Sequence, residues 1–121
     1  MSLPESDSRP VLLHNPRCSK SRAAHALLEE RGVDFEERRY LDAPLSRAEL
    51  AALQERLGRS PREWIRKGES AYKEAGLGPD SDDGAILDAM EKHPILVERP
   101  ILVTAKWAAV GRPPESILEL L

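Results

Sequence analysis

The residues best suited to chemistry lie in the segment LLHNPRCSKSR, residues 12–22, which contains the only cysteine of the 121-residue chain, Cys18. His14 stands four residues before this cysteine, and Arg22 stands four residues after it. A thiolate is a strong nucleophile, and nearby cations or the N-terminus of a helix favour its formation. The reactivity of Cys18 therefore depends on the element that begins there.

Sequence patterns on either side of Cys18 predict a strand, a short loop and a helix. Residues 10–15, PVLLHN, form a short apolar run that ends before a proline, which is typical of a buried strand. From Cys18 onward, alanine and leucine recur at three- and four-residue spacing as far as Gly32, which indicates a helix. Cys18 then lies where unpaired backbone N–H groups stabilise a thiolate or hold an oxyanion.

Basic residues strengthen the prediction of a reactive thiol. Arg22 lies one turn into the predicted helix on the same face as Cys18, and Arg17 and Lys20 add local positive charge. Such surroundings lower a thiol pKa from about 8.5 to between about 3.5 and 7.5. The alternative is a small buried cysteine without a chemical role. His14 likewise either helps to set the protonation of the thiol or is a satisfied core histidine.

The chain after Gly32 predicts a second strand and then a helical segment. Residues 33–41, VDFEERRYL, place apolar side chains between polar ones, so strand, helix and strand form a βαβ unit with parallel strands. Residues 43–94 carry helix signals instead, and Ser46 with Glu49 has the spacing of a capping box. Further helices are predicted after Ser60–Pro61, over residues 69–76 and over residues 81–93.

The C-terminal part returns to strands. Residues 99–111, RPILVTAKWAAVG, contain two apolar runs close enough for a hairpin, and Pro113 or Pro114 opens a last helix. The predicted fold class is therefore α/β, with the order β-α-β, helical insertion, β-β-α. We predict one domain, residues 1–121, with these parts: a core at about 10–42 and 95–121, an insertion at about 43–94 and a flexible leader at 1–9.

Composition narrows the classes of function. Hydrophobic residues make up 40% of the chain and charged residues 32%, which is typical of a globular domain. The net charge of −3 argues against nucleic-acid binding, because no basic surplus faces the phosphates. We expect no membrane span, no signal peptide and a cytoplasmic location. A single cysteine excludes an internal disulfide and most cysteine metal sites, and we expect no metal, no bound cofactor and a monomer.

Three motifs together resemble one known family. The segments HNPRCSKSR, IRKGESAYKE and RPILVTAKWAAVGRP are similar to those of the ArsC-type arsenate reductases, the glutaredoxin-dependent class with a thioredoxin-like core. The resemblance extends over residues 11 to about 119, and it implies the same topology as the sequence patterns. The second motif is less specific than the other two.

The resemblance implies a role for each matching residue. Cys18 matches the nucleophile that attacks arsenate, and His14 matches the histidine four positions before it. Pro100 matches a proline that is usually cis and faces the cysteine. The remaining matches are the oxyanion-binding arginines and the residues that complete the anion loop, namely Arg66, Arg99, Arg112, Ser21 and Arg22. Three guanidinium groups can bind a tetrahedral oxyanion through charge-assisted hydrogen bonds.

The implied mechanism is attack of the Cys18 thiolate on arsenic, followed by resolution from outside the chain. Glutathione is the implied co-substrate and glutaredoxin the implied partner, because the chain offers no second thiol. Ser19 and Lys20 stand where the family often has Gly-Thr, and Lys20 adds a positive charge at the rim of the predicted anion site. Two alternatives remain open: an Spx-type regulator that binds RNA polymerase, and a monothiol glutaredoxin-like protein acting on mixed disulfides.

Overall fold

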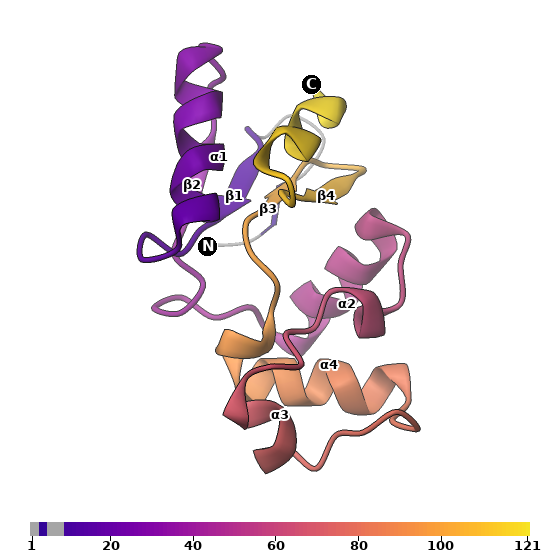
Figure 1. Ribbon diagram of the computed structural model, residues 1–121. Coiled ribbons are helices and arrows are strands. Elements are labelled where there is room, and N and C mark those ends of the chain that lie inside the picture. The colour runs from indigo at the N-terminus through magenta and orange to yellow at the C-terminus, as the bar shows by residue number, and fades with distance from the viewer. Residues whose placement is uncertain (1–2, 5–8) are drawn as a thin grey trace.

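A four-stranded mixed sheet lies at the centre of the structure, a computed structural model that describes residues 3–4 and 9–121 (Figure 1). The strand order is β2-β1-β3-β4. β1 and β2 run parallel, whereas β3 is antiparallel to both β1 and β4. These directions confirm the predicted βαβ unit and the predicted hairpin. The strands are β1 (Val11–Leu13), β2 (Glu36–Arg38), β3 (Ile101–Val103) and β4 (Ala108–Val110).

Alternating residues of β1 and β3 give the sheet two apolar faces. Leu12 and Leu102 are paired across the two strands and pack against α1 (Ser19–Glu30) and the C-terminal 3₁₀ helix η3 (Pro114–Leu120). The side chains that complete this layer are Ala24, Leu28 and Ile117. Because α1 is packed on the sheet in this way, its N-terminus is held beside the end of β1, where Cys18 lies.

The helical insertion covers the opposite face. Figure 1 shows it gathered at one end of the molecule, away from α1. Its apolar side chains share one hydrophobic core with the sheet; among its members are Leu50, Leu53, Trp64, Met90, Val11, Leu13, Ile101 and Val103. Its elements are α2 (Arg47–Leu57), η1 (Pro61–Glu63), α3 (Ser70–Glu74), α4 (Asp83–Lys92) and η2 (Pro94–Leu96).

The predicted capping box at the start of α2 is confirmed. The Ser46 hydroxyl accepts the Glu49 N–H at 3.1 Å, and the Glu49 carboxylate accepts the Ser46 N–H at 3.0 Å. Gly58 ends this helix in the left-handed conformation, with φ of 65°, which a residue without a Cβ adopts at little cost. Local sequence signals therefore specify both ends of α2.

Three predicted elements differ in extent or type. The strand predicted over residues 33–41 pairs only at Glu36–Arg38, and the last helix is of the 3₁₀ type. The helix predicted after Ser60 is a single 3₁₀ turn. It ends there because Trp64 is fully buried and Ile65 forms a bridge to Val97, so tertiary packing overrides the N-terminal helix signal.

The predicted flexible leader, residues 1–9, falls in large part on residues 1–2 and 5–8, which lie outside the described residues. Leu3, by contrast, is buried against the core, and the Pro4 carbonyl accepts a hydrogen bond from Arg56 at 3.0 Å. Arg9 forms ion pairs with two carboxylates, at 3.1 and 2.6 Å. No helix in the described part of the chain is long and apolar enough to cross a bilayer.

Candidate active site

Cys18 is the N-cap residue of α1, as the sequence predicts. Its backbone is extended, with φ of −94° and ψ of 127°, and its carbonyl accepts the Arg22 N–H at 3.0 Å. The loop before it is closed by hydrogen bonds to Asn15, whose carbonyl accepts the Cys18 N–H and whose side chain accepts the Arg17 N–H, both at 3.0 Å. Cys18 remains partly exposed to solvent.

The surroundings of Cys18 favour its thiolate. Partial burial raises the pKa of the thiol, but the nearby backbone N–H groups of Ser21 and Lys20 and the charge of the Arg99 guanidinium outweigh that effect. The pKa therefore lies below its ordinary value. A helix N-terminus and one arginine act together here, and both also attract an oxyanion.

Arg99 reaches this site from the segment just before β3. The Arg99–Pro100 peptide bond is cis, the isomer that the resemblance implies for Pro100. Two guanidinium nitrogens of Arg99, Nε and Nη1, are buried and have no hydrogen-bond partner in the described chain. A buried donor without a partner is rare in folded proteins, and a catalytic role or a bound ion is one explanation for it. Arg99 is thus a candidate to bind the oxyanion.

Arg66 and Arg112 meet around a carboxylate that the sequence analysis does not single out, Glu98. Arg112 Nε lies 2.7 Å from Glu98 Oε1, and Arg66 Nε lies 4.0 Å from the same oxygen. Arg66 also pairs with Glu69 at 2.5 Å, and Arg112 Nε donates to the Arg99 carbonyl at 3.0 Å. The three predicted arginines therefore gather at one region, but two of them are already paired with acidic residues.

The backbone explains how Arg66, from the insertion, comes to this region. Its N–H donates to the Leu96 carbonyl at 2.8 Å, and the Glu98 N–H donates to the Trp64 carbonyl at 3.0 Å. These bonds flank the bridge between Ile65 and Val97 and align the two segments antiparallel. A contact across the tertiary structure, rather than local sequence, places Arg66 beside Glu98.

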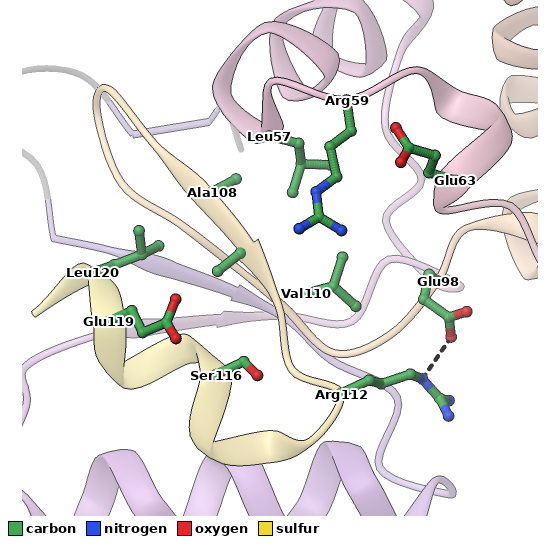
Figure 2. Close-up of a pocket in the computed structure, with 11 residues that line it drawn as sticks. Leu57, Arg59, Glu63, Glu98, Ala108, Val110, Arg112, Ser116, Glu119 and Leu120 are labelled. Carbon is green, nitrogen blue, oxygen red and sulfur yellow. Dashed lines mark ion pairs between the residues drawn. The ribbon is translucent and has the colours of Figure 1, made fainter.

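A pocket of about 480 Å³ opens beside the Glu98–Arg112 pair, between β4, η3 and the end of α2 (Figure 2). Figure 2 shows Arg59 extending into it beside Leu57 and Val110. Its wall carries three carboxylates and two guanidinium groups, those of Glu63, Glu98, Glu119, Arg59 and Arg112. Because this pocket wall carries charges of both signs, it is not suited to bind one simple ion. It differs in this from the surroundings of Cys18, which are cationic.

His14 and Ser21 form a buried pair behind the cysteine loop. His14 Nδ1 lies 2.5 Å from Ser21 Oγ, which also accepts the Asn15 N–H at 3.0 Å. Burial lowers the pKa of His14, against the opposing charge of Glu37, whose carboxylate lies 3.9 Å from Nε2. Burial thus favours the neutral imidazole, which contacts the Ser21 hydroxyl behind the loop.

The Arg22 side chain contacts the same loop. Its Nη1 donates to the Pro16 carbonyl at 3.0 Å, so it braces the turn between β1 and α1. Among the described residues, no three His, Cys, Asp or Glu side chains are grouped as a metal ion requires.

Comparison with known proteins identifies the relatives of this chain. The model of the ArsC family matches residues 13–120. The chain belongs to the ArsC family. It is 49% identical over 112 residues to a protein of Neisseria meningitidis serogroup A named arsenate reductase, covering 91% of this chain and 96% of that protein.

Other members of the ArsC family support the same assignment. YfgD of Escherichia coli, described as uncharacterized, is 46% identical over 112 residues, which cover 91% of this chain and 94% of YfgD. The solved structure of an arsenate reductase from Vibrio cholerae superposes with a TM-score of 0.87 at 44% identity, covering 93% and 97% of the two chains. The predicted α/β fold with a thioredoxin-like core is therefore confirmed.

Sequence reasoning missed two residues of this ArsC site. Glu98 lies next to Arg99 in the sequence, but nothing local distinguishes it from other surface carboxylates. Tyr40 follows β2 and is fully buried, but it is out of step with the alternation of Val33 and Phe35, so that pattern does not single it out. The position of its hydroxyl near Cys18 depends on how β2 is placed beside β1, and no short sequence pattern reports that.

Proposed function

We propose that this chain reduces arsenate to arsenite through thiol chemistry at Cys18. One observation carries the proposal: a cysteine whose pKa is lowered lies beside Arg99, whose buried Nε and Nη1 have no partner among the described residues. A nucleophile and free donors for an oxyanion thus occupy one site. Membership of the ArsC family and a relative named arsenate reductase favour arsenate among the oxyanions.

The first step of the proposed reaction forms a bond between Cys18 and arsenic. The thiolate attacks dihydrogen arsenate, an arsenic–oxygen bond breaks, and the departing hydroxide takes up a proton and leaves as water. Arg99 stabilises the charge on the remaining oxygens through charge-assisted hydrogen bonds. Arg66 and Arg112 assist when their contacts with Glu98 give way to the arsenate oxygens, and Ser21 and Arg22 hold the anion loop, as the family resemblance implies.

Glutathione supplies the electrons in this proposal. Two glutathione thiols are oxidised to one disulfide while arsenic gains two electrons; with one proton taken up, dihydrogen arsenate gives arsenous acid and water. Glutaredoxin removes the glutathione bound in the intermediate. The 121 residues contain one cysteine, so these electrons cannot come from the formation of a disulfide within the chain. No bound cofactor is required, and the need for reduced glutathione fits the expected cytoplasmic location.

The test couples arsenite formation to NADPH oxidation, with glutathione, glutaredoxin and glutathione reductase present. We expect one arsenite per NADPH, no turnover in Cys18→Ser, and a large loss in Arg99→Gln. Arg47→Gln is the matched control, because this arginine, at the start of α2, pairs with Asp88 of α4 within the helical insertion. Absence of arsenite from a wild-type sample with a fully reduced thiol would refute the proposal; reduction of a glutathione mixed disulfide in that sample would favour the glutaredoxin-like alternative.

A further inference from the structure

Three buried side-chain polar atoms have no hydrogen-bond partner in the described part of the chain: Arg99 Nε, Arg99 Nη1 and the hydroxyl oxygen of Tyr40. All three belong to the region of Cys18. Tyr40 is fully buried, yet its hydroxyl is within electrostatic reach of Arg99, Arg66 and Cys18, each of which affects its pKa. Since buried polar groups are normally paired, three such atoms in one place indicate a missing partner.

The chemical nature of the missing partner follows from these groups. A guanidinium has N–H donors and no acceptor, and it keeps its charge in proteins. Burial raises the pKa of Tyr40 to about 12, against the charges of Arg99 and Arg66, so the hydroxyl stays protonated and able to donate. Arg99 lies close enough to this hydroxyl to lower its pKa, but the two groups do not meet the geometry of a hydrogen bond in the described chain. The partner must therefore be an acceptor, and an anion with several oxygens can pair with all of them.

We propose that the Tyr40 hydroxyl donates a hydrogen bond to an oxygen of the tetrahedral oxyanion bound at Cys18, which makes Tyr40 a substrate-binding residue alongside Arg99. This inference rests on the oxyanion site of the proposed function and adds a neutral donor to it. The hydroxyl adds no charge to the site. It therefore strengthens binding of the anion without adding to the positive charge that stabilises the thiolate when no anion is bound.

The test removes only the hydroxyl, with Tyr40→Phe. Arsenate and, separately, inorganic phosphate are titrated as protectants of Cys18 against iodoacetamide, and the concentration dependence of protection provides the dissociation constant. A hydrogen bond to a charged acceptor predicts binding roughly 10- to 100-fold weaker in the variant. The melting temperature should not fall, because the hydroxyl has no partner to lose. Tyr72→Phe, at the other tyrosine, is the matched control and should bind both anions like the wild type.

A second measurement keeps the wild-type protein and does not depend on the folding of a variant. With tyrosine ring carbons labelled, NMR should show the Tyr40 signal shifting as phosphate is added, while the Tyr72 signal stays in place. Equal protection of Tyr40→Phe and wild type, an unshifted Tyr40 signal, or no protection of wild type by either anion would each overturn the proposal. Weaker protection in Tyr40→Phe supports the role of Tyr40 in anion binding even when no arsenite forms. The binding experiment therefore tests this proposal separately from the reductase activity.

Discussion

The ion pair between Arg38 and Glu49 offers a direct test of how the insertion is joined to the sheet. Arg38, at the end of β2, donates to both Glu49 oxygens at 2.6 and 3.1 Å and to the carbonyls of Ala43 and Pro44 at 2.9 and 2.7 Å. The two side chains are 4% and 19% exposed. The pair thus stabilises the turn that follows Tyr40. Substitution of Glu49 by Gln should therefore lower the free energy of unfolding.

The size of the effect follows from burial. Removing one partner of a buried ion pair costs about 3–5 kcal/mol. Glu49 keeps some exposure and Arg38 keeps its two carbonyl acceptors, so we expect the lower end for Glu49→Gln, about 3 kcal/mol. For a chain of this length that corresponds to a melting temperature lower by roughly 10 °C. The amide oxygen of Gln can still accept the Ser46 N–H, so the helix cap is preserved.

The pH dependence adds a second signature of this pair. Burial raises the pKa of the Glu49 carboxyl, but hydrogen bonds from Arg38 and the Ser46 N–H outweigh it, so the pKa lies below its ordinary value in the folded state. The stabilisation is therefore complete above the unfolded pKa of about 4.3 and is lost as the pH falls through the folded value. Glu49→Gln should flatten the acid side of the stability profile.

Urea denaturation of four proteins measures the pair: wild type, Glu49→Gln, Arg38→Met and the double variant. Glu49→Gln should cost much less once Arg38 is already Met, because the charge it pairs with is gone. Glu55→Gln, at an exposed position of the same helix, is the matched control and should change stability by less than about 0.5 kcal/mol. Additive losses in the double variant, or an equal loss in Glu55→Gln, would contradict the reasoning.

Three further predictions concern the site and its support. A Cβ added at Gly111 would lie 2.6 Å from Pro100 Cγ, so Gly111→Ala should lower the unfolding free energy in urea by about 1–3 kcal/mol through overcrowding. Arg99→Gln should move the pH midpoint of Cys18 alkylation upward, because a positive charge that lowers the thiol pKa is removed; an unmoved midpoint would contradict this assignment. Ser46→Ala should cost about 1 kcal/mol of thermal stability, the usual effect of losing an N-cap.

Much of the secondary structure could be predicted because its signals are local. The capping box at Ser46 and Glu49 acts over three residues, and the helix that begins after Cys18 follows from apolar spacing within α1. The Ser60–Pro61 signal predicted more helix than forms, since burial of Trp64 decides where that chain turns. Local patterns predict an element well only where no distant contact competes with them.

The features of the candidate site likewise differ in whether the local sequence predicts them. Position at a helix N-terminus helps to lower the pKa of Cys18, and a segment of about ten residues is enough to predict that position. The site roles of the arginines were predicted from family resemblance, and they remain predictions. Their surroundings could not be predicted, because Glu98 meets Arg66 through an antiparallel contact between the insertion and the segment before β3.

The sequence by itself determined the element order, the N-terminal position of Cys18 on its helix and the lack of a second thiol in these 121 residues, since each depends on neighbours in the chain or on composition. Only the tertiary structure decided that Arg99 and Tyr40 bring donors without a partner among residues 3–4 and 9–121 to that thiol, while Arg66 and Arg112 share a carboxylate. The physical reason is that a hydrogen bond needs both a donor and an acceptor. The tertiary structure determines which groups from distant parts of the chain meet.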